Sequence, residues 1–286
     1  MSRRTRPLLL LAPALVLLGG LFFAGLGLGL VRSFRYMPAL GLDTPDLAAY
    51  AAILQSGTFL ASLGLSLWIA AASTVLASIL ALGTALLLRE TFPGRALIGF
   101  LVQLNLTIPH VVGAIGILYL VSQSGSFARL AFAAGLVAVP SDFPPLTHDP
   151  LAIGIILTYV WKELPFIALI LLANLQAIPP GHEAAARSLG AGRWQVLRHV
   201  TLPLLMPGLV AASSLVFAFA FGAYEIPLLL GAHAPEALPV ATWRGFTAVD
   251  LMHRPEAYAM AMIVALVSAV LLALYASFAL PRRARP

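Results

Sequence analysis

Six apolar segments, each long enough to cross a lipid bilayer, constrain the fold of this chain most strongly. A helix needs about 20 predominantly apolar residues to cross ~30 Å of hydrocarbon. Only helices and closed barrels satisfy their backbone hydrogen bonds in lipid, and solid apolar runs, without the alternation of ~10-residue barrel strands, favour helices. The sequence therefore predicts an all-α integral membrane protein with six transmembrane helices. The predicted spans lie roughly over residues 7–31, 59–88, 97–121, 151–175, 203–230 and 257–280.

Composition agrees with this class. The chain is 60% hydrophobic and only 10% charged, whereas a soluble domain is usually ~25% charged. The pieces between the spans are short, so residues 1–286 are predicted to form a single transmembrane domain. The first apolar run exceeds the ~7–15 residues of a signal-peptide core and is predicted to be a membrane span. The chain has no cysteine, which excludes disulfides and thiolate metal sites.

The distribution of arginines predicts the orientation. Cytoplasmic loops of membrane proteins carry an excess of Lys and Arg. With the N-terminus in the cytoplasm, eleven arginines lie inside and five outside, so both termini and the loop after the fourth span are cytoplasmic in a multi-pass protein of the cell (inner) membrane. The net charge of +6 then reflects topology, and no nucleic-acid partner is expected. The inside set is Arg3, Arg4, Arg6, Arg89, Arg95, Arg187, Arg193, Arg198, Arg282, Arg283 and Arg285.

A polar loop over residues 176–202 separates the fourth and fifth spans. The run Pro179-Pro180-Gly181 ends the fourth span and can start a new helix. Good helix formers follow from Glu183 to Leu189, and Gly190 suits the left-handed position that ends a helix. A second short helix is predicted over 193–200, before the proline that opens the fifth span. The loop is thus predicted to hold two short cytoplasmic helices.

This loop resembles that of permease subunits of binding-protein-dependent ABC importers, which have the MetI-like fold. That family carries Glu-Ala-Ala, three residues, Gly, nine residues, an aliphatic residue, one residue, and then Leu-Pro. Counted back from the matching glycine, the family's Glu falls on Ala184, one residue after Glu183. The remaining motif positions match without gaps, and the aromatic residue lies where one is common in the family: Ala185, Ala186, Gly190, Trp194, Val200, Leu202 and Pro203.

The resemblance implies partners and roles. The segment 190–199 is expected to insert into a groove on a separate ATPase dimer. A second permease subunit, more readily a paralogue than another copy, and an extracytoplasmic solute-binding protein are implied too. The residues implied to couple to the ATPase are Glu183, Ala185, Ala186, Gly190, Arg193, Trp194, Leu202 and Pro203.

The chain itself is expected to be no enzyme and to need no cofactor. Its only lysine, Lys162, is followed by Glu163, so the Gly-Lys-Ser/Thr signature of an ATP-binding P-loop is missing. No paired acid and base and no metal-ligand cluster stand within one segment, so neither catalytic nor metal-binding residues are predicted. The energy for transport is therefore expected from a partner subunit.

Charged groups inside the spans are candidates for the solute pathway. Such groups cost several kcal/mol in lipid and face water paths or pair with one another. Because adjacent residues of a helix do not face each other, a Lys162–Glu225 ion pair across the fourth and fifth spans is one hypothesis. The alternative, that these charges simply hold helices together, stays open. The pathway candidates are His110, Lys162, Glu163, Tyr224 and Glu225.

Helix breakers are expected to bend two spans. Pro109 marks a kink in the third span, and Pro207, Gly222 and Pro227 do so in the fifth. The segment Phe-Gly-Ala-Tyr-Glu-Ile-Pro over 221–227 looks most like the polyamine-type permease group, whose relatives handle iron, thiamine and sulfate. A polyamine-like organic cation is the substrate that this resemblance implies.

Two other functional classes remain as alternatives. A self-sufficient ion-coupled carrier or channel built from the same six spans would use Glu225 or Lys162 as its ion-linked group and ignore the cytoplasmic loop. The loop also has features of a DNA-binding helix-turn-helix, but fewer than 30 residues between two spans cannot supply that domain's own core. Changes in the loop distinguish the importer from the carrier.

Overall fold

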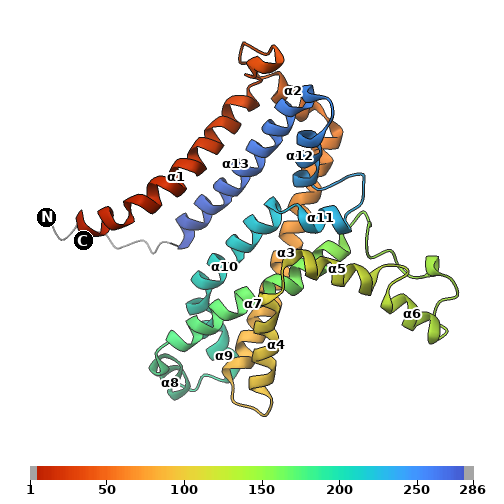
Figure 1. Cartoon of the computed structure of the whole chain (residues 1–286). Coiled ribbons are helices and arrows are strands. Elements are labelled where there is room, and N and C mark those ends of the chain that lie inside the picture. Colours follow the sequence, from red (N-terminus) through yellow and green to blue (C-terminus); the bar gives the residue numbers. More distant parts are fainter. Residues whose placement is uncertain (1–4, 280–286) are drawn as a thin grey trace. The chain divides into compact units, whose positions relative to one another are not determined.

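The computed structural model describes residues 5–279, and their regular secondary structure is entirely helical (Figure 1). The described part contains six helices long and apolar enough to cross a membrane, so the predicted all-α membrane fold with six spans is confirmed. Several arginines used to predict the orientation lie outside the described residues, and only the backbone of Arg6 is described. The arginines that lie outside the described residues are Arg3, Arg4, Arg282, Arg283 and Arg285.

The chain divides into two compact units. The first comprises residues 1–60 and 241–266, and the second comprises residues 61–240 and 267–286. In the first unit, Arg32 donates to the hydroxyl of Tyr258 at 2.6 Å, and the hydroxyls of Ser33 and Tyr50 lie 2.8 Å apart. The helices that are wholly or partly in this unit are α1 (Thr5–Ser33), η1 (Pro38–Leu40), α2 (Ala48–Gln55), α3 (Gly57–Arg89), α12 (Leu238–Thr247), η4 (Leu251–His253) and α13 (Arg254–Ala279).

The second unit is organised around α7 (Ile153–Ala177). Four helices pack against it: α4, α5, α10 and α11. Fully buried alanines one turn apart on α3, at 77, 81 and 85, let that helix join the same core as Ile167 and Leu205. The remaining helices of this unit are α4 (Arg95–Thr107), α5 (His110–Val121), α6 (Ser126–Ala133), η2 (Pro140–Asp142), α8 (Pro180–Ser188), α9 (Arg193–Val196), η3 (Leu197–Thr201), α10 (Leu202–Gly222) and α11 (Glu225–Leu230).

The third predicted span, 97–121, differs from the structure. The chain breaks at Ile108 and Pro109 into α4 and α5, and the helical segment long enough to cross a membrane is His110–Ala133. Ile108 is extended, with φ −79° and ψ 124°. A proline has no N–H and forces the residue before it out of the helical region, so the expected kink is a complete interruption.

The fifth predicted span, 203–230, also differs at both ends. The helix starts earlier, because α9, the π-helical turn η3 and α10 follow one another without interruption from Arg193 to Gly222. The predicted separate helix over 193–200 is therefore the start of this span. Pro203 lacks the N–H that would bond the His199 carbonyl, and a π-helical turn is a common way to absorb such a defect. At the other end, Ala223 is extended, and α11 forms a separate short helix.

Candidate functional site

The predicted coupling loop begins with α8, and the end of this helix is sharply defined. Gly190 has φ +87°, in the left-handed region that favours glycine. Its N–H donates to the carbonyl of Arg187 at 2.9 Å, and the N–H of Ala191 donates to Ala186 at 3.1 Å. This pair of bonds is the Schellman motif, which satisfies the last carbonyls of a helix. Gly190 therefore turns the chain from α8 towards α9, as the sequence predicts.

Glu183 of α8 holds the loop to two other helices. Arg89, the last residue of α3, donates from both Nη atoms to the two carboxylate oxygens, at 2.7 and 2.9 Å. The hydroxyl of Thr201, at the end of η3, donates to Oε1 at 2.7 Å. Such forked guanidinium–carboxylate pairs are among the strongest and most directional in proteins. We call the three residues Arg89, Glu183 and Thr201 the loop anchor.

The loop anchor is electrostatically satisfied. The hydrogen bonds from Arg89 hold the pKa of Glu183 below its usual range, with help from Thr201 and from Arg187, whose Nη2 lies 3.6 Å from Oε2. Burial acts in the opposite direction but is outweighed, although Glu183 is only 7% exposed. The carboxylate is therefore ionised at neutral pH, and its oxygens face inward, to partners within the chain.

The outward face of the loop carries apolar side chains instead. Leu189 is 90% exposed and Trp194 is 69% exposed. Ala185, Gly190 and Arg193 are also exposed, as expected for a docking surface. The other predicted coupling positions are less accessible or lie at the start of α10: Ala186 and Leu202 are half-buried, and Pro203 is exposed.

Sequence reasoning missed two members of the loop anchor. Arg89 counts only as a cytoplasmic charge in the orientation argument, and Thr201 is an unnamed position between motif residues. A signal was present, because an acid and an arginine that are both predicted to lie at the cytoplasmic side of the membrane can pair. Nothing in the linear sequence, however, reveals that α8 folds back to the end of α3.

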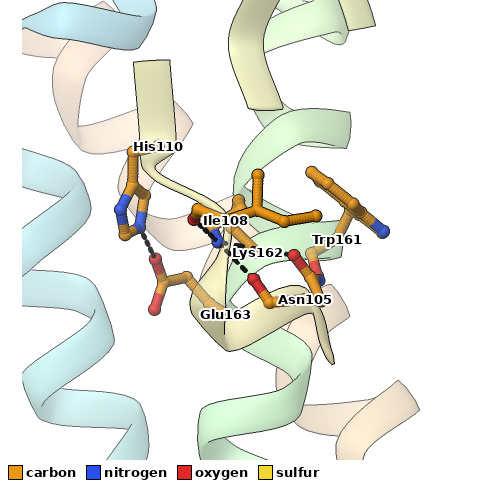
Figure 2. Close-up of polar contacts among 6 residues, drawn as sticks. All are labelled: Asn105, Ile108, His110, Trp161, Lys162 and Glu163. Atoms are coloured by element: carbon orange, nitrogen blue, oxygen red, sulfur yellow. Dashed lines mark hydrogen bonds and ion pairs between the residues drawn. The ribbon is translucent and has the colours of Figure 1, made fainter. Parts of the chain in front are cut away.

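A second polar cluster lies where α4 ends and α5 begins (Figure 2). The ammonium of Lys162 donates to the carbonyls of Asn105 at 2.7 Å and Ile108 at 2.6 Å. In an unbroken helix the Asn105 carbonyl would accept from residue 109, but Pro109 has no N–H. Lys162 therefore replaces a donor that proline removes.

Trp161 and Glu163, the residues on either side of Lys162, also contact α4 and α5. The side-chain amide of Asn105 donates to the carbonyl of Trp161, and Gly113 of α5 lets the Trp161 ring come close, since a Cβ there would lie 2.9 Å from it. Nε2 of His110 lies 3.0 Å from Oε1 of Glu163. We call Asn105, Ile108, His110, Trp161, Lys162 and Glu163 the break cluster.

The structure contradicts the predicted Lys162–Glu225 pair. The residue Lys162 is only 3% exposed, and its ammonium donates to the two carbonyls at the helix break. Glu225 starts α11 and is half-buried, and Tyr224 beside it is 36% exposed. The physical reason is that backbone carbonyls freed by the helix break are costly to bury without a donor, and Lys162 supplies that donor.

The contacts of His110 and Glu163 bring further side chains to the same place. The His110 ring lies 4.9 Å from the ring of Phe219 on α10, and Phe219 lies 6.4 Å from Tyr159 on α7. Of the sequence-predicted pathway residues, His110 and Glu163 are in contact, and α11, which begins at Glu225, packs against α5 and α7. Among residues 5–279, no three His, Asp or Glu side chains are spaced to hold a metal ion.

Comparison with known proteins decides the family. The family model for binding-protein-dependent transport system inner membrane components matches residues 73–285. The chain belongs to this family. The match includes both the loop anchor and the break cluster, so each lies within the part that defines a family member.

Relatives of this transport family share about a third of their residues with the chain. A probable ABC transporter permease protein of Sinorhizobium fredii is 33% identical over 66% of this chain and 63% of its own length. A probable molybdenum ABC transporter permease protein of Haloferax volcanii is 36% identical over 57% of this chain and 55% of its own. The chain thus spans less than two thirds of the length of these two relatives. The thiamine transport system permease protein ThiP of Salmonella typhimurium is 29% identical over 82% of this chain and 42% of its own.

A solved structure supports the fold. In a bacterial alginate ABC transporter, solved in complex with a periplasmic protein that carries an alginate pentasaccharide, one chain superposes with a TM-score of 0.77. The alignment covers 95% of this chain and 93% of that chain, at 21% identity. The two chains therefore share a fold.

Proposed function

We propose that this chain is the transmembrane permease subunit of an ATP-driven importer, forming half of a solute pathway and coupling to a separate ATPase. One observation carries this proposal: the loop anchor holds α8 rigidly while Leu189 and Trp194 stand exposed beyond it. Exposed apolar side chains on a rigid polar element mark a surface that another protein covers. The ATPase is the partner that family membership favours.

The loop anchor gives the coupling a physical path. Closure of an ATPase dimer around ATP pulls on the docked α8–α9 segment. Through Glu183, that displacement reaches Arg89 at the end of α3 and Thr201 at the start of α10. Both helices form the core with α7, so a movement of the loop tilts packed helices together rather than bending a flexible tether.

The assembly needs further subunits. One coupling loop serves one ATPase subunit, so an ATPase dimer needs a second permease, for which a paralogue is favoured over another copy. An extracytoplasmic binding protein delivers the solute. The chain lies in the inner membrane with its coupling loop and both termini in the cytoplasm, which the arginine distribution supports.

Family membership leaves the solute open. The names of the relatives specify molybdenum and thiamine, and the structural neighbour handles alginate. None of these names mentions a polyamine, so the polyamine specificity read from residues 221–227 gains no support from them. A polyamine-like organic cation remains only as one member of a broader class, while iron and sulfate rest on sequence resemblance alone.

Co-purification and uptake test the proposed function. The tagged chain, extracted from its host in a mild detergent, is expected to bring an ATPase and a second six-span subunit with it. In proteoliposomes carrying that assembly, Leu189→Ser with Trp194→Ser should abolish ATP-driven uptake while the chain stays in the membrane. Leu136→Ser is the matched control, because Leu136 is 78% exposed but lies far from the loop in sequence. Solute movement by the chain alone, without ATP and unaffected by the loop variants, would establish the carrier instead.

A further inference from the structure

We propose that an organic cation binds beside α5, α7 and α11, held by Glu225, Glu163 and the phenol of Tyr159. The inference rests on the proposed function, since it names the class of solute for the same pathway. It goes further in assigning a charge to the solute and a role to Tyr159, which sequence reasoning passed over.

The first observation is an acid without a counter-charge. Within residues 5–279, the structure gives the carboxylate of Glu225 neither a hydrogen bond nor an ion pair, although the residue is half-buried. Glu163 is 8% exposed, and among the described residues the only side chain that its carboxylate contacts is His110. Glu163 lies in a membrane-spanning helix, where a carboxylate is costly unless a positive charge or donors accompany it.

The second observation is that the nearby cation is already engaged. Lys162 directs its ammonium to two backbone carbonyls and to Oδ1 of Asn105 at 3.4 Å. The ammonium offsets part of the negative charge of Glu163. Its three N–H donors are all used in these contacts, so none remains for Glu225. Acids therefore outnumber lysines here, with Glu163 and Glu225 against Lys162 alone.

The third observation is independent of the acids. Tyr159 is completely buried, yet its hydroxyl has no hydrogen-bond partner in the part of the chain that the structure describes. It lies four residues before Glu163, on the same face of α7. The helix that begins at Glu225, α11, packs against α7 and α5. A buried hydroxyl left unpaired costs about 1–3 kcal/mol, and the oxygen of a phenol can accept a hydrogen bond from an ammonium.

Aromatic rings favour an organic cation at this place. Phe219 is flanked by the His110 ring at 4.9 Å and by the Tyr159 ring at 6.4 Å, and it is 42% exposed. Aromatic faces attract desolvated organic cations. Two carboxylates repel an oxyanion such as molybdate, and a neutral sugar leaves the excess charge unmatched. The four groups therefore select a solute with a single positive charge.

Equilibrium binding to the intact assembly tests this inference. The probes are two organic cations, thiamine and choline, with molybdate and trehalose as an anion and a neutral sugar. The permease–ATPase assembly is held in nanodiscs without its binding protein, so that only the membrane site is measured. At least one cation is expected to bind, and Glu225→Gln and Glu163→Gln should each weaken it about tenfold or more. Tyr159→Phe, which removes only the hydroxyl, should weaken it less. Asp43→Asn, at an exposed position of the first unit, should leave binding unchanged.

The outcomes separate this inference from the proposed function. If neither cation binds at concentrations of about 10 mM, or if the three variants bind the cation as the unaltered chain does, the inference is overturned. It is overturned too if molybdate or trehalose binds and the glutamate variants do not weaken that binding. In each case, retained ATPase co-purification and ATP hydrolysis leave the importer standing. Loss of the ATPase from the unaltered chain would instead remove the proposed function.

Discussion

The loop anchor and the break cluster bury charge at helix ends in different ways. In the loop anchor, Arg89 and the hydroxyl of Thr201 donate hydrogen bonds to the carboxylate of Glu183, and both carboxylate oxygens have a donor. In the break cluster, the one cation is used on backbone carbonyls, and Glu163 keeps a single histidine contact. A saturated ion pair makes a stiff joint, whereas acids left short of donors can bind something that arrives. Our two proposals follow this difference: they assign the transmission of movement to the loop anchor and solute recognition to a site that includes Glu163 of the break cluster.

Removing the arginine of the loop anchor should give the largest effect. Arg89→Ala strands a buried carboxylate, which costs ~3–5 kcal/mol in a fully buried pair. Because the Arg89 side chain is 35% exposed, we expect about 2–4 kcal/mol in the unfolding free energy and loss of coupled uptake. The double variant with Glu183→Gln should recover part of the stability, since no bare charge remains. Unfolding of both variants in detergent measures this, with the exposed Arg198→Ala as control. A double variant less stable than Arg89→Ala would contradict the claim that Arg89 compensates for the buried charge of Glu183.

The break cluster should lose stability through its backbone. Lys162→Met leaves the carbonyl of Ile108 unpaired, at a cost of about 1–3 kcal/mol for a buried group of this kind, and leaves the carbonyl of Asn105 with only the N–H of Ile108 at 3.2 Å. Adding Pro109→Ala supplies an N–H for the Asn105 carbonyl and should restore part of that loss. Thermal unfolding of the three variants checks this order. If Pro109→Ala gives no recovery, Lys162 has a role other than replacing the missing donor.

These two clusters also show how far the sequence could predict the molecule. The number of spans and the loop glycine followed from apolar run length and motif spacing, which are local properties. The partners of Glu183 and Lys162 did not, because they come from residues 94 and 57 positions away. Pro109 indicated a kink, but the donor that compensates for it lies on another helix. Tyr159 looked like an ordinary apolar residue of the fourth span, and only its unpaired hydroxyl in the folded chain distinguishes it.

The loop turn should be sensitive to a single methyl group. Gly190→Ala must hold an L-residue at φ +87°, which costs about 1–2 kcal/mol. We expect a partial loss of coupled uptake as α9 departs at a different angle. Gly181→Ala is the matched control, since Gly181 has no atom close to its missing Cβ and no positive φ. Equal uptake by both variants would mean that the turn does not position the docking surface.

The smallest expected effect is on pH dependence. The pKa of Glu183 is lowered by Arg89 in the folded chain, so the anchor's stabilisation is fully present above the unfolded value of ~4.3 and is lost as the pH falls through the lower folded value. Hydrogen exchange of the α8 amides, corrected for intrinsic rates, should show constant protection from pH 7 to about 5 and a decline in stronger acid. Glu183→Gln should remove that decline. A fall in protection already between pH 7 and 5 would show that the carboxylate is not held by its arginine.

The most direct test of the account is whether the exposed face of the coupling loop touches an ATPase. The chain has no cysteine, so a single Leu189→Cys creates the only thiol in this subunit. Treatment of native membranes with a short reagent that reacts with a thiol at one end and with lysine amines at the other should link it to the ATPase, with a yield that changes when ATP is added. Leu136→Cys, also strongly exposed, should give no such product. A Leu189→Cys chain that reacts with a soluble maleimide yet never cross-links to an ATPase would contradict the central claim.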